Sequence, residues 1–423
     1  MIKMCYIDAA IVNNAGHHAN ACRHFIGEFR RRGFAVHAFG NRVLDHGVGR
    51  ELRVEPLFRH YSYDKLRGRP YAAYLLARSS FLFDLRAAWR RGPFDLVFLH
   101  SVMATQLAAI ALWVRDFRPE EMPFVVIGFD LPSGNKLSGY WNTHTHVFRR
   151  AGRLFDPRYL PRTLFFTFDQ AITDDYAELL GLPVRTMPTV HVGLREPRLR
   201  RRDSNGLISV AFLGYQRPEK GYGLLPEIVR LSLDRRLPIK LLLHNSAPGD
   251  NPINQELRAL AQANANVEFV ADSGDQLYWQ GLLDISDLMV LPYEPDRYRE
   301  SGSGVATEAV SDGIPMVVPS GTTMETLAVS CQGGATSFAN WRAAEITDAI
   351  ERAVAGFETL AEKAESGAWE WRRNNGAKLF VDELLATARL NDTAGSTGPR
   401  RESVRDVLLG RILDGLVSRL VMK

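Results

Sequence analysis

Residues 207–225, LISVAFLGYQRPEKGYGLL, are the stretch that decides the fold. A strand-length apolar run at 209–214 is followed at once by a basic loop and then by the start of a helix. Strand, loop and helix in this order form half of a βαβ unit, and repeating that unit builds a parallel sheet. The same alternation continues on both sides of the stretch, so the sequence predicts a parallel α/β protein.

Each half of the chain contains its own series of strand-length runs. In the first half, the expected strands are residues 3–12, 34–39, 96–100, 124–129 and 170–173, with helices over 19–32 and 101–117. In the second half, the expected strands are residues 209–214, 239–244, 267–270, 287–292 and 315–319. Each half therefore predicts one doubly wound, Rossmann-like domain, and such domains bind ligands at the carboxyl ends of their strands.

A charged stretch that contains Pro197 and Gly206 separates the two halves. The predicted boundaries are 1–193 for the first domain, 194–206 for a linker, 207–370 for the second domain, 371–390 for a helix that returns to the first domain, and 391–423 for a second linker and a tail helix. In the tail, apolar residues recur at helical spacing among arginines, which predicts a basic amphipathic helix. It is expected either to contact an anionic membrane or to pack on protein.

Composition places the chain among globular proteins and excludes other classes. The 423 residues are 46% hydrophobic and 24% charged, and this length fits two domains. Three cysteines at unrelated spacings predict neither a disulfide framework nor a zinc site. No apolar run is long enough to span a bilayer and the first residues lack a secretory signal pattern, so we expect a cytoplasmic protein.

Arginines cluster at 30–32, 86–91 and 198–202, although the net charge is only +4. Such clusters are usually solvated surface, with an acidic membrane or an anionic acceptor as the alternative. Aromatic residues adjoin them only at Phe29 and Trp89, and no nucleic-acid-binding fold is recognised. Nucleic acid is therefore not an expected partner.

The basic loop of the second domain suits a diphosphate. Arg217 and Lys220 follow Gly214 at the end of a predicted strand and lie beside a helix start. Two cations offset the charge of a diphosphate, and the amides at a helix N-terminus point at its oxygens. An ordinary solvated turn is the alternative interpretation.

A second motif follows the strand predicted at 287–292. Residues 300–309 read ESGSGVATEA, in which small residues let the backbone approach a ligand at a helix start. Glu308, one or two turns into that helix, can accept hydrogen bonds from a ribose diol. Glu300, on the loop, is placed to meet a sugar.

Together the two motifs resemble those of the Glu-x7-Glu retaining glycosyltransferases of the GT-B architecture. The resemblance implies two Rossmann-like domains facing a central cleft, a nucleotide-diphosphate-sugar donor such as a UDP- or GDP-sugar, and a glycan or lipid-linked acceptor, without a metal ion or cofactor. It implies that Arg217 and Lys220 bind the diphosphate, with further phosphate contacts from the amides around Ser303, Gly304 and Val305. It also implies that Glu308 binds the ribose and Glu300 the transferred sugar. His244, which ends a predicted strand, either approaches the base or caps the strand.

The first domain carries a weaker signal for the acceptor side. Gly16, His17 and His18 follow the first predicted strand and resemble the family's glycine-rich loop, with His17 where the second glycine is usual. His100 and Asp130 lie at the ends of two further strands. These side chains are interpreted either as acceptor contacts and proton-handling groups or as structural residues.

Two rival functions remain open at this stage. A sugar-nucleotide epimerase has the same two-domain layout and acts without an acceptor. A non-catalytic nucleotide-sugar-binding scaffold would bind the donor without turnover.

Overall fold

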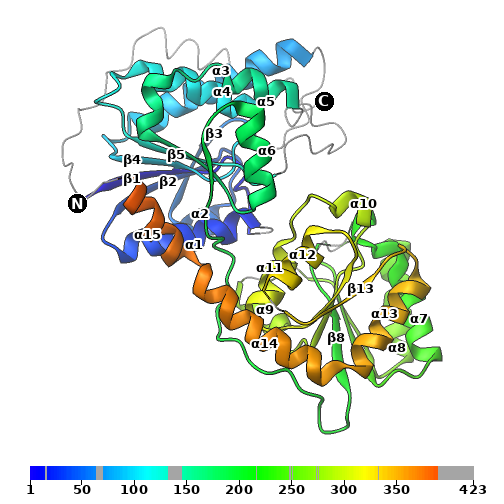
Figure 1. The fold of residues 1–423 in the computed structure, drawn as a ribbon. Helices are drawn as coiled ribbons and strands as arrows, with labels where there is room; N and C mark the ends of the chain where they lie inside the picture. Colours follow the sequence, from blue (N-terminus) through cyan, green and yellow to red (C-terminus); the bar gives the residue numbers. More distant parts are fainter. Residues whose placement is uncertain are drawn as a thin grey trace. The chain divides into compact units, whose positions relative to one another are not determined.

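The computed structural model describes residues 1–14, 17–62, 70–131, 145–215, 217–246, 249, 251–272, 274, 276–331 and 333–388. The chain forms two compact units (Figure 1). The first contains residues 1–14, 18–189 and the segment that begins at Ala377, and the second contains Val190–Gly376 together with His17. The predicted helix of the tail lies outside the described residues, as does Gly16.

The first unit is built on a parallel sheet of seven described strands in the order β3-β2-β1-β4-β5-β6-β7. Its strands are β1 (Lys3–Ile7), β2 (Ala35–Asn41), β3 (Val54–Phe58), β4 (Leu96–Leu99), β5 (Phe124–Gly128), β6 (Thr163–Thr167) and β7 (Val184–Thr186). Its helices are α1 (His17–Arg31), α2 (His46–Leu52), α3 (Pro70–Trp89), α4 (Ala104–Trp113), α5 (Thr145–Gly152), α6 (Gln170–Leu180) and α15 (Ala377–Ala388). This strand order is that of a doubly wound fold.

The second unit repeats the architecture with six described strands in the order β10-β9-β8-β11-β12-β13. Its strands are β8 (Ile208–Phe212), β9 (Ile239–His244), β10 (Val267–Val270), β11 (Leu288–Val290), β12 (Met316–Pro319) and β13 (Ala335–Phe338). Its helices are α7 (Leu225–Asp234), α8 (Pro252–Ala263), α9 (Gln276–Asp284), α10 (Pro295–Tyr298), α11 (Gly304–Ser311), α12 (Thr323–Ser330), α13 (Ala343–Ala355) and α14 (Phe357–Asn374). The predicted fold class, two doubly wound Rossmann-like units, is confirmed.

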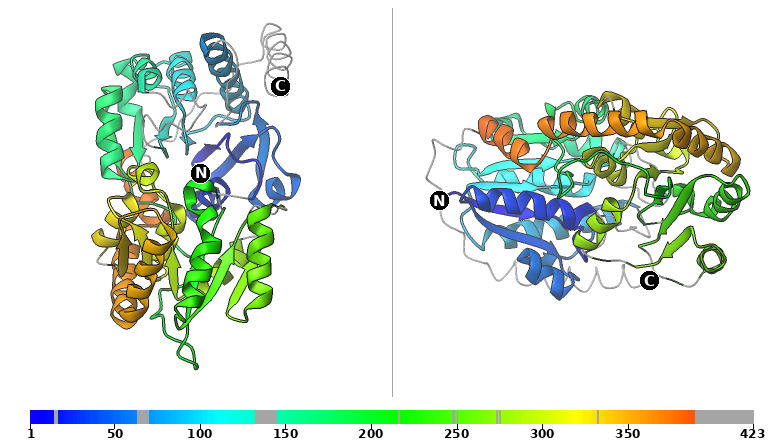
Figure 2. Two further views of the ribbon diagram at one scale, coloured as in Figure 1. Left: turned by 90° about the vertical axis from the view of Figure 1, so that its right-hand side faces the viewer. Right: turned by 90° about the horizontal axis from the view of Figure 1, so that it is seen from below.

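Helices cover both faces of the second sheet, and the strand sequences show why (Figure 2). Along β8, Val210 and Phe212 belong to one apolar cluster, while Ala211 and the next residue, Leu213, belong to another. Successive side chains of a strand point to opposite faces, so a continuous apolar run requires a helix layer on each side. Strands of this kind leave a continuous apolar run in the sequence.

The prediction of a strand at 170–173 was wrong. Residues Gln170–Leu180 form helix α6, and the carboxylate of Asp169 accepts hydrogen bonds from the amides of Ala171 and Ile172. An aspartate at this position is a strong helix start signal, and it outweighs the β-branched Ile172 and Thr173. The neighbouring strand is instead β6, and the sequence analysis also missed β3, β7 and β13.

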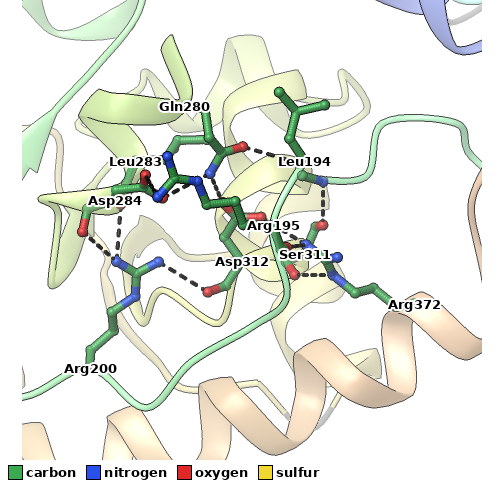
Figure 3. Close-up of polar contacts among 10 residues, drawn as sticks. Leu194, Arg195, Arg200, Gln280, Leu283, Asp284, Ser311, Asp312 and Arg372 are labelled. Atoms are coloured by element: carbon green, nitrogen blue, oxygen red, sulfur yellow. Dashed lines mark hydrogen bonds and ion pairs between the residues drawn. The ribbon is translucent and has the colours of Figure 1, made fainter. Parts of the chain in front are cut away.

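The stretch 194–206, which we expected to be a linker between the domains, packs on the second unit (Figure 3). Only 4% of Arg200 is exposed. Its guanidinium donates to the carbonyls of Leu283, Asp284, Ser286 and Asp312 at 2.9–3.1 Å. Burial lowers the pKa of Arg200 to about 10, so the side chain stays charged at neutral pH.

The helix predicted over 371–390 is broken in two. Helix α14 ends at Asn374, Gly376 has a φ of 113°, and α15 begins at Ala377. Phe380 on α15 packs in the first unit, 4.9 Å from Phe25 and 5.0 Å from Phe166 between ring centroids. None of the helices in the described ranges is long and apolar enough to cross a membrane.

We expect Arg200→Ala to lower the free energy of unfolding by about 3 kcal/mol, because four carbonyl groups lose their donor. Urea unfolding followed by circular dichroism measures the change. The neighbouring Arg201 is exposed, and Arg201→Ala should stay within about 0.5 kcal/mol of the wild type. Equal stability of the two variants would contradict the structural role of Arg200.

Candidate functional site

The basic loop after β8 is pressed against the loop that follows β11. Gly221 has a φ of 74°, and a Cβ atom there would lie 2.0 Å from the carbonyl oxygen of Pro292. The amide of Glu294 donates to the carbonyl of Glu219 at 2.9 Å. Only glycine allows both this backbone conformation and this approach, so Gly221 fixes the position of the loop.

The two cations of this loop lie over tyrosine rings. The ammonium of Lys220 is 5.0 Å from the ring centroid of Tyr293, and the guanidinium of Arg217 is 5.1 Å from that of Tyr215. Arg217 is also 3.8 Å from the carboxylate of Glu219, with 54% of its side chain exposed. Cation–π contacts hold both groups while leaving their N–H donors able to reach an anion.

The N-terminus of α11 lies beside the start of the same loop. Ser303 caps the helix by accepting a hydrogen bond from the amide of Ala306 at 3.3 Å. Gly214 has a φ of 114°, and a Cβ atom on it would be 3.3 Å from Val305. The contact is with the Cγ2 atom of Val305, so the side chain of this first-turn residue lies against the backbone at Gly214. A helix N-terminus of this kind favours an anion.

The two glutamates of the second motif differ in their surroundings. Glu308, on α11, is half-buried and accepts a hydrogen bond from the indole Nε1 of Trp279 on α9 at 2.7 Å. Glu300 is exposed on the loop before α11. The hydroxyl of Thr323 donates to the carbonyl of Ser301 at 2.6 Å and ties this loop to α12. Sequence reasoning missed Trp279, which lies 29 residues before Glu308.

His244 connects backbone segments at the carboxyl edge of the second sheet. Its Nδ1 accepts a hydrogen bond from the amide of Gly214 at 3.3 Å, so its Nε2 donates to the carbonyl of Asp272, at 2.8 Å. The side chain is buried, and burial lowers its pKa. Of the two roles left open for His244, these hydrogen bonds favour the one that caps the strand.

In the first unit, two of the predicted histidines meet at a carboxylate that sequence reasoning missed. Asp8 directly follows β1, His18 lies in the first turn of α1, and His100 directly follows β4. Oδ2 of Asp8 is 2.8 Å from Nδ1 of His18 and 3.2 Å from Nδ1 of His100. All three side chains are buried. A polar residue directly after a buried strand was the available sequence signal for Asp8.

The electrostatics of this cluster keep Asp8 ionised. Burial raises the pKa of Asp8, but the charge of His18 and hydrogen bonds from both histidines outweigh it and hold the pKa well below its usual range. Two imidazoles and a carboxylate are also metal ligands, and their ligating atoms lie within 4.8 Å of one another. A histidine that binds a metal through one ring nitrogen normally donates a hydrogen bond from the N–H of the other. Nε2 of His100, however, has no hydrogen-bond partner among the described residues. The donor set therefore fits a metal only incompletely.

The predicted acceptor-side residues differ in how deeply they are buried. His100 is 1% exposed; besides Asp8 and His18 it contacts the rings of Phe25 and Phe168. Asp130 follows β5 and is half-buried. Next to it, Phe129 is buried and stacks on Tyr176 at 4.3 Å. Gly16 and the side chain of His17 lie outside the described residues.

Comparison with known proteins gives a clear result for the fold alone. No protein-family model and no curated protein matches the sequence. Among solved structures, sucrose-phosphate synthase from Thermosynechococcus elongatus has a TM-score of 0.66 at 14% identity, over 93% of this chain and 100% of that one. HepE from Anabaena, in complex with UDP and glucose, has a TM-score of 0.61 at 14% identity, over 93% and 100%.

A third similar structure is a putative UDP-N-acetylglucosamine 2-epimerase from Listeria monocytogenes, with a TM-score of 0.58 at 12% identity, over 95% of this chain and 100% of that one. The similar structures thus include GT-B glycosyltransferases and UDP-sugar epimerases. The chain has the GT-B fold, as the two motifs of the second unit predicted.

Gly221→Ala should lower the free energy of unfolding by about 2 kcal/mol, because alanine at a φ of 74° is strained and its Cβ would collide with Pro292. The matched control is Gly223→Ala, since no atom lies within 4 Å of a Cβ there. Chemical denaturation compares the two. The constraint on the loop is refuted if Gly221→Ala is no less stable than Gly223→Ala.

Asp8→Asn should cost about 2 to 4 kcal/mol of stability at pH 7, because the amide cannot replace a carboxylate bound to two histidines. The pKa of Asp8 is lowered in the folded state, so its stabilisation is lost as the pH falls below about 4, the unfolded value. The difference between variant and wild type should therefore narrow below about pH 4.

Urea unfolding between pH 7 and pH 2 measures this difference. Asp116→Asn, at a partly exposed ion pair with Arg86, is the control and should change stability by less than about 1 kcal/mol. A stability gap for Asp8→Asn that stays constant down to pH 2 would be inconsistent with an ionised Asp8.

Proposed function

We propose that the protein is a retaining glycosyltransferase that transfers a sugar from a nucleotide-diphosphate-sugar donor to a glycan or lipid-linked acceptor. The observation that carries this proposal is the convergence, in the second unit, of the Arg217–Lys220 loop with the N-terminus of α11. Gly221 fixes the loop against Pro292, and Gly214 brings its start beside Val305. Cations and helix amides at one edge suit a diphosphate.

In this mechanism Arg217 and Lys220 stabilise the charge that develops on the leaving diphosphate. Electrostatic stabilisation of a leaving group by positioned cations replaces the role that a metal ion has in other enzymes. Amides at Ser303, Gly304 and Val305 add contacts to the phosphates. Glu308 binds the ribose and Glu300 the hydroxyls of the transferred sugar.

The transfer retains the anomeric configuration. The bond between the anomeric carbon and the diphosphate oxygen breaks, and the acceptor oxygen bonds to that carbon on the same face. The leaving phosphate oxygen takes the proton of the acceptor hydroxyl. Glu300 and Glu308 act here as binding groups, so the paired-carboxylate mechanism of glycoside hydrolases is not involved.

The similar structures support a nucleotide-sugar donor. HepE from Anabaena was solved with UDP, with UDP and glucose, and with UDP-glucose. We extend that ligand class to this chain, as a UDP- or GDP-sugar. The proposal further includes a location in the cytoplasm and contact of the predicted tail helix with an anionic membrane, which rest on the apolar and arginine spacing of that segment.

A sugar-nucleotide epimerase is the second candidate, because epimerases such as the UDP-GlcNAc 2-epimerase of Neisseria meningitidis, bound to UDP-GlcNAc, have the same fold at a TM-score of 0.57. The two functions differ in what they require. An epimerase converts the sugar nucleotide when no acceptor is present, whereas a transferase needs the acceptor. Analysis of products with and without acceptors separates them.

The direct test is calorimetric titration of the full chain, without added metal, with UDP, GDP, ADP and their common sugar conjugates. Selective binding of one nucleotide is the expected outcome, and it names the base. Acceptor screening with that donor then tests transfer, and the anomeric configuration of the product tests retention. If none of these nucleotides binds, the proposal is overturned.

The double variant Arg217→Ala and Lys220→Ala should weaken binding of the nucleoside diphosphate about a hundredfold, because two charge-assisted contacts are lost. Binding of the bare nucleoside should change little. Arg201→Ala, which removes an exposed charge from the same unit, serves as the control. Equal losses for the nucleoside and its diphosphate would rule out a diphosphate role for the loop.

A further inference from the structure

We propose that Trp279 is a positioning residue of the donor site, which holds the carboxylate of Glu308 in the orientation that meets the ribose. This inference rests on the proposed function, in which Glu308 binds the ribose. The single N–H of the indole donates to Oε2 of Glu308 at 2.7 Å. Hydrogen bonds to a carboxylate are stronger than those between neutral groups, so this contact restrains the rotamer of Glu308.

The contact is compatible with a ligand. A carboxylate has two oxygens and about four acceptor positions, while an indole N–H fills one of them. Trp279 has no acceptor of its own, so it can orient the carboxylate without competing for the hydroxyl hydrogens of a diol. Both side chains are half-buried, at the transition between packed core and surface.

A second hydrogen bond joins the same two helices, α9 and α11, next to Trp279. Gln280, the next residue on α9, is 4% exposed and donates to Oδ2 of Asp312 at 2.7 Å (Figure 3). Asp312 follows Glu308 by one helical turn at the end of α11. Adjacent residues of α9 therefore bind carboxylates one turn apart. The Gln280 contact fixes the spacing of the helices, and the Trp279 contact acts on the side chain of Glu308.

The indole also packs against a rigid neighbour. Its ring centroid is 5.9 Å from that of His244, which bonds the backbone of Gly214 and of Asp272 through its two ring nitrogens. Gly214 is the residue that lies beside Val305 at the start of α11. The orientation of Glu308 is thus tied to the same backbone that positions the diphosphate loop.

The experiment compares a nucleoside diphosphate with its 2′,3′-dideoxy analogue, using the base that the wild type binds best. In the wild type the ribose form should bind more tightly. Trp279→Phe keeps an aromatic ring and removes the donor, so it should reduce this preference about tenfold while binding of the dideoxy analogue stays the same. Trp369→Phe, at a 44% exposed tryptophan of the same unit, is the matched control and should keep the full preference.

A double-mutant cycle separates positioning from general packing. In a Glu308→Ala background, Trp279→Phe should have no further effect on the preference for ribose. If Trp279→Phe fails to fold, as judged by its thermal transition, a benzothienyl analogue of tryptophan at position 279 keeps the bicyclic shape and has sulfur in place of the N–H donor. The analogue should give the same loss of preference.

The outcomes distinguish this inference from the proposed function. Binding of the ribose form by the wild type, with full preference kept in both position-279 variants, would refute the role of Trp279 and leave the donor site intact. An equal loss for both ligands would assign Trp279 to packing and would also refute it. Failure of the wild type to bind any nucleotide would instead remove the proposed function.

Discussion

The arrangement of the second unit depends on the hydrogen bonds that the carboxylate of Asp312 accepts. This carboxylate lies at the end of α11 and accepts hydrogen bonds from Gln280 on α9 and from Arg372 on α14, at 2.7 and 3.0 Å. The backbone carbonyl of Asp312 accepts a hydrogen bond from the guanidinium of Arg200. Burial raises the pKa of Asp312 and lowers that of Arg372, so ionising both groups in this position is costly. Such a network adds little stability over apolar packing, and its effect is to select one geometry for the elements it joins.

The same network explains a glycine in the segment that enters the unit. A Cβ atom on Gly193 would lie 1.6 Å from Oδ1 of Asp312, and the amide of Gly193 donates to the hydroxyl of Ser311 at 2.7 Å. Backbone, helix end and buried charge therefore occupy one small volume. Because α11 begins at the proposed phosphate contact and ends at this network, both ends of the helix are fixed within the unit.

The sequence predicted the central strands well because they are buried on both faces and leave a continuous apolar pattern. Among these, the strand at 239–244 was placed at its observed bounds. Strand β3 contains Glu55 and Pro56 at an edge of its sheet, and β7 has three residues, so neither leaves such a pattern. The strand predicted at 170–173 shows the opposite failure, in which a local capping aspartate outweighs β propensity.

The candidate residues that the sequence suggested are local in sequence. Arg217 and Lys220 lie in the loop after β8 and Glu308 lies within α11, and the strand, loop and helix pattern of the chain itself predicts these placements. Asp8 and Trp279 were not found, because their importance comes from contacts with His100 and Glu308, which are distant in sequence. For His100 and His244 the sequence left a ligand contact and a structural role open, and the contacts that distinguish these roles come from distant residues: His100 packs against the ring of Phe25, and His244 bonds the backbone of Gly214 and Asp272.

The return of α15 to the first unit has a consequence for the order in which the chain folds. Residues Val190–Gly376 are continuous, whereas the first unit needs the segment from Ala377 onward. Phe380 contacts Phe25, Phe98 and Phe166, so these rings lack that contact until synthesis has passed Ala377. The unit that begins the chain is therefore the last to be completed on the ribosome, and a nascent chain that stalls before Ala377 presents an exposed aromatic surface.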